Sequence, residues 1–129
     1  MTIPLRTRVA VLALLASSAL TAAFAVDAAH AARARARPRA CDVSKVSDRL
    51  GPTSVTSLKV LRVSCDTGIS VVRAFHACRL AHGTSGRCVR LVKGYACREQ
   101  RTNAPTQFSA TVTCAKDRAS VVHRYTQTL

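Results

Sequence analysis

The stretch from Ser57 to Leu80, SLKVLRVSCDTGISVVRAFHACRL, decides the fold because a strand pattern in it runs directly into a helix pattern. Its first part, Ser57–Val63, is rich in aliphatic and β-branched residues, which is typical of a strand. Ser64 then offers a hydroxyl group for a helix N-cap, and Asp66 places an anion in the first turn, where the helix dipole favours it. The stretch therefore predicts a strand followed by a helix that begins at about Cys65.

The predicted helix runs from about Cys65 to Leu80 and has one apolar side. Its apolar residues at helical spacing are Ile69, Val71, Val72, Phe75 and Cys78. A helix with a single apolar stripe needs one partner layer, and a sheet can provide it. His76 lies beside the stripe, so we expect it to be a partly buried packing residue.

Downstream of the helix the chain predicts three more strands. They are Val89–Cys97, Phe108–Cys114 and Val121–Tyr125, separated by the loop residues His82–Gly86, Thr102–Pro105 and Lys116–Arg118. Gly94 is expected to bend the first of these strands, and Tyr95 is expected to pack under the helix. The predicted fold class is α+β, with one helix packed on a small, mostly antiparallel sheet in the order β-α-β-β-β, stapled by disulfides.

The chain before residue 55 has a different composition. Residues 32–40, ARARARPRA, offer no large apolar side chain to bury, so we expect a disordered basic arm. Residues 41–50 carry apolar residues at helical spacing and predict one or two helical turns, which Gly51-Pro52 ends. The predicted division is therefore a basic, largely disordered arm and short N-terminal segment at 32–54, and a disulfide-stabilised α+β domain at 55–129.

The first 31 residues have the pattern of a secretory signal peptide. Two arginines precede an apolar run from Val9 to Val26, and cleavage is expected after Ala31 or Ala25. The rival interpretation is an uncleaved anchor, since a run of about 18 residues is at the lower edge of what spans a bilayer. An even number of cysteines in a short chain favours the oxidising side. We therefore expect a secreted protein, extracellular or cell-wall associated, with no stable membrane anchor after cleavage.

The charge balance is strongly basic. The formal net charge is +14, and removing residues 1–31 would take away Arg6, Arg8 and Asp27 and leave +13. Such a field attracts anionic polymers and surfaces, such as a cell-wall polymer or anionic lipid. The candidate contact residues in the arm are Arg33, Arg35, Arg37 and Arg39. The alternative is compositional drift, because a G+C-rich genome also favours arginine and alanine; no sequence feature indicates specific nucleic-acid binding.

Six cysteines allow 15 disulfide pairings, and the predicted elements narrow them. Cys65 and Cys78 lie about 20 Å apart on one helix, which is too far for a bridge. Tracing the predicted strands from end to end places three pairs near each other. These are Cys65–Cys97, Cys88–Cys114 and Cys41–Cys78.

Four short motifs follow one another along the chain: Val63-Ser64-Cys65, Cys88, Gly94-Tyr95-Ala96-Cys97 and Val112-Thr113-Cys114. This pattern resembles a loose group of small secreted cysteine-containing proteins of unknown function from high-G+C Gram-positive bacteria. The resemblance covers roughly residues 55–125. It implies an exported bacterial protein with this type of fold, and implies nothing about activity.

The sequence offers two possible chemical sites and favours neither. Cys78, His82 and Cys88 have a spacing that zinc ligands use, but oxidised cysteines cannot ligate and no fourth ligand is evident. Glu99 and His123, with Arg101 or Arg124 as the cation, could in principle cleave RNA by acid–base chemistry. No pattern in the sequence brings them together. We therefore expect no catalytic residue, no metal and no cofactor.

The leading functional hypothesis is a non-enzymatic binding module at the cell envelope or outside the cell. A small extracellular hydrolase of the ribonuclease type is the first alternative. An inhibitor of an extracellular enzyme is the second, with the loop Ala81–Arg87 presented as the contact segment. The sequence leaves the oligomeric state open.

Overall fold

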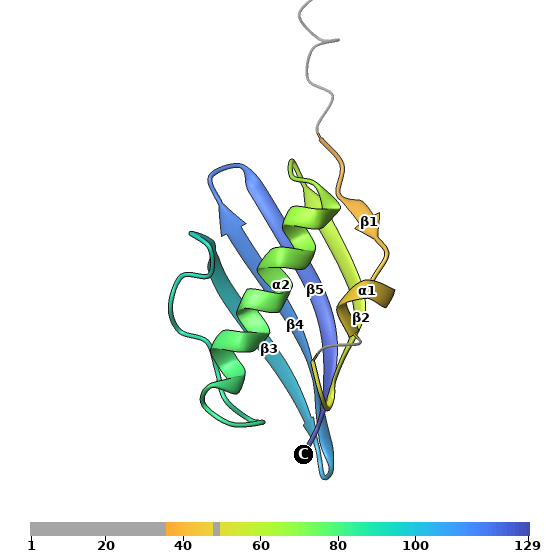
Figure 1. Cartoon of the computed structure of the whole chain (residues 1–129), viewed down its shortest axis with the longest axis vertical. Coiled ribbons are helices and arrows are strands. Elements are labelled where there is room, and N and C mark those ends of the chain that lie inside the picture. The colour runs from red at the N-terminus through yellow and green to blue at the C-terminus, as the bar shows by residue number, and fades with distance from the viewer. Residues whose placement is uncertain (1–35, 48–49) are drawn as a thin grey trace, which may run out of the picture. The chain divides into compact units, whose positions relative to one another are not determined.

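The computed structural model describes residues 36–47 and 50–129 of the chain, and these form a single sheet crossed by one long helix (Figure 1). The sheet is antiparallel with strand order β1-β2-β5-β4-β3. Its strands are β1 (Arg39–Cys41), β2 (Thr53–Leu61), β3 (Ala96–Ala104), β4 (Gln107–Lys116) and β5 (Ala119–Thr128), and the helices are α1 (Ser44–Ser47) and α2 (Cys65–Leu80). The predicted α+β fold class with one helix on a disulfide-stapled sheet is confirmed.

Helix α2 has the predicted bounds, and local chemistry explains its start. The hydroxyl of Ser64 accepts a hydrogen bond from the backbone N–H of Thr67 at 3.1 Å, which satisfies one of the free donors of the first turn. Gly68 faces β2 so closely that a Cβ there would lie 2.5 Å from a methyl carbon of Val60. The absence of a side chain at Gly68 therefore allows the helix to approach the sheet.

The core lies between α2 and one face of the sheet. Strand residues alternate between this face and the solvent, as the burial of every second residue in β2, β4 and β5 shows. The fully or nearly buried apolar residues include Val46, Leu58, Val60, Val71, Val72, Phe75, Phe108, Val112, Val121 and Tyr125. None of the helices in residues 36–47 and 50–129 covers the opposite face of the sheet, which is lined by Thr, Ser, Gln and Arg side chains.

The region between α2 and β4 differs from the prediction. A strand was expected at Val89–Cys97, but β3 begins only at Ala96, because Lys93 and Gly94 adopt positive φ angles of 50° and 80°. They form a tight turn between Val92 and Tyr95. The strand β3 then continues through residues 102–104, where a turn was predicted.

The other boundaries shift by a few residues. Strand β2 begins at Thr53 and ends at Leu61, because Arg62 has a positive φ of 59° that stops the extended chain. The predicted disordered arm is wrong for Arg39 and Ala40, which pair with β2 as part of β1. The predicted signal peptide and Arg33 and Arg35 lie outside the described residues. Within residues 36–47 and 50–129, no helix is both long and apolar enough to cross a bilayer.

All six cysteines form disulfides, but not in the predicted pairs. The bridges are Cys41–Cys65, Cys78–Cys88 and Cys97–Cys114. The three predicted pairs, Cys65–Cys97, Cys88–Cys114 and Cys41–Cys78, are therefore wrong. These pairs depended on a predicted strand that begins at Cys88 and ends at Cys97, whereas β3 begins at Ala96.

Each observed bridge follows from a local neighbourhood. Cys88 lies in a loop that returns past the end of α2, so it meets Cys78 with a Cα–Cα distance of 5.3 Å. Cys97 and Cys114 are direct cross-strand partners of β3 and β4, 4.0 Å apart at Cα. Cys41 meets Cys65 because β1 pairs with the end of β2 that leads into α2.

The Cys41–Cys65 bridge gives a testable prediction about β1. Replacing both cysteines with serine is expected to lower the free energy of unfolding by about 2–4 kcal/mol. Because β1 is only three residues long and pairs with β2 alone, its amide protons should also lose protection from hydrogen exchange. In a matched Cys97→Ser/Cys114→Ser variant, β1 should keep its protection, since the ladder of β1 is untouched. Unchanged exchange in β1 after loss of the Cys41–Cys65 bridge would contradict this account.

Candidate functional site

A cluster of polar side chains is buried at the C-terminal end of α2, on the core side of the sheet. Its members come from α2 and from the three strands β2, β3 and β5: Thr53, His76, Arg79, Glu99, Arg101, His123, Tyr125 and Gln127. Strand alternation places the sheet residues of this cluster on the same face as the apolar core. The sequence prediction missed most of this cluster, because its members are distant in sequence and become neighbours only through the antiparallel register.

Arg79 is the centre of the cluster and is fully buried. Its guanidinium donates to Nδ1 of His76 at 2.9 Å, to the carbonyl oxygen of Thr84 at 2.9 Å and to Oγ1 of Thr53 at 2.6 Å. It also donates to Oε1 of Gln127. Burial lowers the pKa of Arg79. One cation thus ties the helix, the following loop and the ends of β2 and β5 together.

Two buried histidines lie beside Arg79. The ring centroids of His76 and His123 are 5.2 Å apart, and both side chains are fully buried. Burial lowers the pKa of His76 to about 2, helped by the charges of His123 and Arg79, and burial together with the charge of Arg79 lowers the pKa of His123 to about 3. The hydrogen bond from Arg79 to Nδ1 also requires an unprotonated nitrogen on His76. Both rings are therefore neutral at physiological pH, and His76 is more deeply buried than predicted.

Glu99 forms the acidic part of the cluster. Its carboxylate pairs with Arg101 at 2.9 Å and with Arg87 at 3.5 Å, and it accepts a hydrogen bond from the hydroxyl of Tyr125. The side chain of Glu99 is only 5% exposed. Burial, followed by the hydrogen bond to Glu99, raises the pKa of Tyr125. Two arginines thus balance the charge of Glu99, and the hydroxyl of Tyr125 donates a hydrogen bond to it.

The residues considered for RNA cleavage do not form an accessible site. Glu99 and His123 face the same side of the sheet in one row, with Val112 between them. His123 is fully buried, and its lowered pKa keeps the ring neutral near neutrality, so it cannot act as a general acid in the imidazolium form. Arg124 lies on the opposite, exposed face and donates to Thr111 instead. Only Glu99 and Arg101 of this set are in direct contact.

The residues considered for zinc binding are likewise not arranged as ligands. Cys78 and Cys88 are bonded to each other, so neither has a thiolate to offer. His82 lies on the exposed turn that follows α2. In the part of the chain that the structure describes, no group of three or more His, Cys, Asp or Glu side chains could hold a metal ion.

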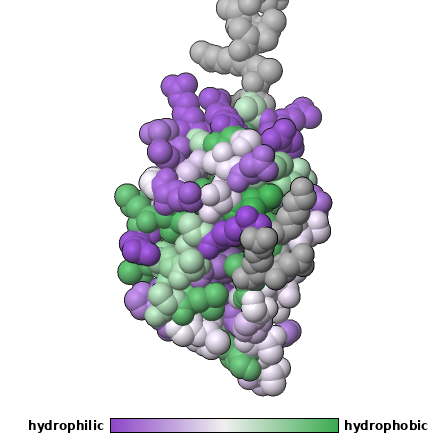
Figure 2. Space-filling view, viewed as in Figure 1, coloured by the Kyte–Doolittle hydropathy of each residue, from purple (hydrophilic) through white to green (hydrophobic). Residues whose placement is uncertain are grey.

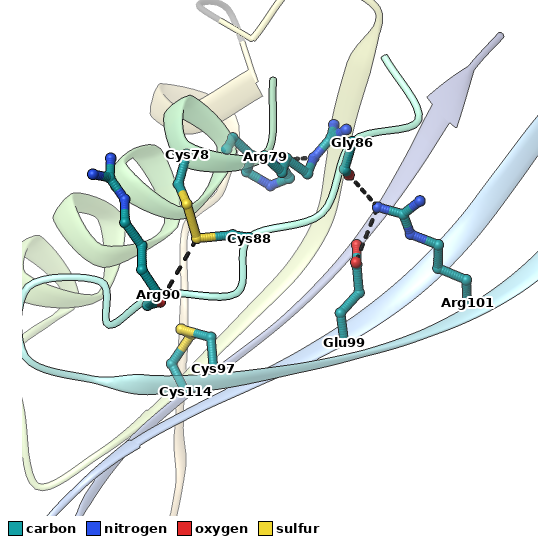
Figure 3. Close-up of a disulfide and its surroundings, with 10 residues drawn as sticks. Cys78, Arg79, Gly86, Cys88, Arg90, Cys97, Glu99, Arg101 and Cys114 are labelled. Carbon is teal, nitrogen blue, oxygen red and sulfur yellow. Dashed lines mark hydrogen bonds and ion pairs between the residues drawn. A yellow bond between two sulfur atoms is a disulfide. The ribbon is translucent and has the colours of Figure 1, made fainter. Parts of the chain in front are cut away.

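Arg79 and Arg101 also hold the loop that follows α2 in place. Arg101 donates to the carbonyl oxygens of Ser85, at 2.8 Å, and of Gly86 (Figure 3). Together with the bond from Arg79 to Thr84, this fixes three successive carbonyl groups. A Cβ at Gly86 would lie 2.1 Å from the backbone oxygen of Arg79, so only glycine fits at this contact.

The opposite end of the sheet is the candidate binding surface. Arg37, Arg39 and Arg62 line an open hollow of about 490 Å³ together with Val60, Val63 and Ser64. The register places the β4–β5 turn at the same end, because Leu61 pairs with Ser120 and Lys116 pairs with Ala119. We call Arg37, Arg39, Arg62, Lys116 and Arg118 the basic end. Figure 2 shows hydrophilic side chains gathered at this end of the molecule.

Two of the four arginines predicted to contact an anionic partner, Arg37 and Arg39, belong to the basic end. Among the described residues, neither of them has a carboxylate within ion-pair distance, nor does Arg62. Arg62, Lys116 and Arg118 were missed by sequence analysis. These three residues lie in or beside turns between elements. Turns of an antiparallel sheet can lie at the same end, and this position was the signal in the sequence that could have identified them.

No protein-family model, curated protein or solved structure significantly matches this chain. A functional assignment therefore depends on the side chains and their arrangement. The three disulfides indicate an oxidising environment of the kind found outside the cell.

Proposed function

We propose that this protein is an exported, non-enzymatic binding module that holds an anionic polymer or surface at the cell envelope through its basic end. The observation that carries this proposal is the group of arginines around the hollow at Arg37, Arg39 and Arg62. A guanidinium group offers a planar pair of donors that matches the geometry of phosphate and carboxylate groups. Three such groups around one open hollow would bind successive anionic groups of a polymer or a lipid surface.

The overall charge supports the same proposal. The chain has 20 Lys and Arg residues against 6 Asp and Glu residues. Glu99 pairs with Arg87 and Arg101 in the cluster at the other end of the sheet, so it offsets little of the charge at the basic end. Asp66 and Asp117 lie near the basic end and give it some acidic character, but the cations outnumber them. The field around this end therefore attracts anions and raises their rate of encounter.

The buried cluster supports a structural rather than a chemical role for the titratable groups. The two groups best suited to acid–base chemistry, Glu99 and His123, lie beneath the helix and its following loop. A general acid or base must reach the proton that it transfers. Their contacts instead stabilise the ends of the sheet and the loop.

The proposal predicts a specific loss of binding. An Arg37→Ala/Arg39→Ala/Arg62→Ala variant is expected to bind a phosphate-bearing wall polymer, or vesicles of anionic lipid, about 10–100-fold more weakly at low salt. The slope of the logarithm of the binding constant against the logarithm of salt concentration should become shallower by about 2. Co-sedimentation over a salt series measures both quantities, and comparing polymer with vesicles separates the two sources of anionic groups.

The matched control is Lys59→Ala/Arg98→Ala/Arg124→Ala, which removes the same charge from other exposed positions. This control is expected to keep most of the binding. Equal losses in both variants would show that only net charge matters and would reject the basic end as the site. Turnover of RNA by the oxidised protein, lost on His123→Ala substitution, would reject the non-enzymatic assignment.

A further inference from the structure

A groove runs along the outer face of α2, opposite the face that packs on the sheet. Two adjoining hollows of about 500 and 440 Å³ form this groove. Both are lined by Asp66 and Ser70 of α2 and by Lys93 of the turn before β3, so the two hollows are continuous. The loop that contains this turn lies beside the helix (Figure 1). The groove therefore has one wall on α2 and the other on the turn.

The part of the groove along α2 is mostly apolar. Ile69, Ala74 and Ala77 line it, and helical spacing places them on the same face as Asp66 and Ser70. Ala77 is exposed, and Ile69 and Ala74 are half-buried, so a ligand can reach their surface. From Asp66 to Ala77 the groove follows the helix for about 16 Å. An extended alkyl chain of about 12–14 carbon atoms has the same length.

The turn that forms the other wall is well fixed. The backbones of Val92 and Tyr95 exchange two hydrogen bonds, at 2.9 and 2.8 Å, and both side chains are buried. Lys93 lies in this turn with a φ of 50°, a conformation that residues with a side chain adopt less readily than glycine. The fold thus holds Lys93 beside the helix before any ligand arrives, which lowers the entropic cost of binding.

Two ammonium groups lie where the groove approaches the basic end. The Nζ atom of Lys116 is 5.9 Å from the centroid of the Tyr95 ring. A Cβ at Gly94 would lie only 3.3 Å from that Nζ atom, so the glycine leaves room for Lys116 beside Lys93. Among the described residues, neither lysine forms an ion pair, and Asp66 is the one carboxylate that lines the groove. This part of the groove therefore favours an anionic group.

We propose that the groove binds a single-chain anionic lipid, which is an alkyl or acyl chain with a phosphate or carboxylate head. The head contacts Lys93 and Lys116, and the chain lies along the apolar part of α2. Charge at one end and an apolar surface behind it match such a molecule, whereas a polymer without an apolar part leaves the surface of α2 uncovered. This inference rests on the proposed function, because Lys116 belongs both to the groove and to the basic end.

NMR titration of the oxidised full-length chain with alkyl phosphates, each below its micelle concentration, tests the groove. Dodecyl phosphate is expected to bind one-to-one and to shift the amide signals of α2 and residues 92–95, with a Kd on the order of 10–100 μM. Affinity should rise about 2-fold for each added methylene, because an open groove buries about half of the chain. It should level off at about 12–14 carbon atoms, where the groove ends.

Two simpler probes separate the two halves of the ligand. Inorganic phosphate lacks the chain, and dodecyl maltoside lacks the charge. Each should bind at least about 10-fold more weakly than dodecyl phosphate. Carboxylates of the same chain length, compared with the phosphates, show which head the two lysines prefer.

Two variants separate the two parts of the groove. Ala74→Gln/Ala77→Gln fills the apolar part with polar side chains that helices tolerate. This change should weaken binding of dodecyl phosphate at least about 10-fold and remove the dependence on chain length. Lys93→Gln/Lys116→Gln should lower the affinity for dodecyl phosphate to that for dodecyl maltoside, because both charged donors are lost.

The matched control is Arg90→Gln/Arg98→Gln, which removes the same charge from other exposed positions and should bind normally. The Arg37→Ala/Arg39→Ala/Arg62→Ala variant should also bind dodecyl phosphate, so failure of the basic end to hold polymer or vesicles would leave this result unchanged. The proposal is overturned by an absence of shifts in α2 and residues 92–95 at about 1 mM dodecyl phosphate, on the order of 10-fold above the expected Kd. Equal binding by the variant with the filled groove, or affinity that does not depend on chain length, would overturn it as well.

Discussion

An Arg79→Ala variant is expected to lose about 3–5 kcal/mol of unfolding free energy, a large part of the margin of a small domain. The substitution removes a fully buried side chain and leaves a cavity. It also leaves the carbonyl oxygen of Thr84, Oγ1 of Thr53 and Nδ1 of His76 without the donor that Arg79 provides. Oε1 of Gln127 keeps only the hydrogen bond from the hydroxyl of Thr53. Buried acceptors that lose a partner each cost roughly 1–3 kcal/mol, offset in part by local relaxation.

Chemical unfolding followed by circular dichroism measures this loss directly. Arg79→Lys should recover only part of the stability, because an ammonium group cannot reproduce the planar fork that reaches four acceptors. Arg124→Ala is the control, since Arg124 is exposed on the uncovered face of the sheet, and it should change stability by less than about 0.5 kcal/mol. An Arg79→Ala protein as stable as the parent would show that the network adds nothing to the fold.

The second large effect is a loss of stability in mild acid. In the folded protein, burial lowers the pKa of His76 to about 2 and that of His123 to about 3. In the unfolded chain both rings titrate at about 6.5. Below pH 6.5 the unfolded state therefore binds more protons than the folded state, and stability falls as the pH falls. The stabilisation is complete above pH 6.5 and is lost progressively towards pH 3.

Each histidine should cost about 1.4 kcal/mol in total between pH 7.5 and 5.5, because its ring in the unfolded chain becomes mostly protonated over this interval, so the pair should cost about 2–3 kcal/mol. The measurement is the free energy of unfolding by urea at a series of pH values and constant ionic strength. His123→Phe should halve the slope of stability against pH, because only one of the two titrating rings remains. The substitution itself breaks no hydrogen bond, because neither ring nitrogen of His123 has a hydrogen-bond partner among the described residues. Stability that is constant from pH 7.5 to 5.5 would contradict the buried, neutral state of both rings.

The elements predicted correctly are those whose signals are local. The bounds of α2 follow from the cap at Ser64 and from the apolar stripe that ends near Cys78, and both signals lie within one short stretch. Alternation from Phe108 to Cys114 likewise fixed the core of β4. The fold class follows from the order of these elements.

The wrong predictions involve contacts between distant parts of the chain. Val89 and Leu91 suggest a strand by composition, but positive φ angles at Lys93 and Gly94 turn the chain before β3 begins. Because the predicted strand ended at Cys97, whereas β3 begins beside it, the prediction reversed the following strand and placed Cys114 at the end of the sheet away from Cys97, which misplaced the bridges. The polar cluster around Arg79 could not be predicted either. Its members are brought together by the register of the strands and the packing of α2, and not by their spacing in the sequence.

The outermost position of β3 in the sheet has a consequence for self-association. An edge strand offers unpaired backbone groups to other chains and can nucleate edge-to-edge aggregation. The nine residues of β3, ACREQRTNA, contain no large aliphatic or aromatic residue, and Arg98 projects from them into solvent. If the β3 strands of two molecules paired with their Arg98 residues opposite each other, the two like charges would repel. The charge of Arg98 and the lack of large apolar residues on this edge therefore disfavour edge-to-edge association between molecules.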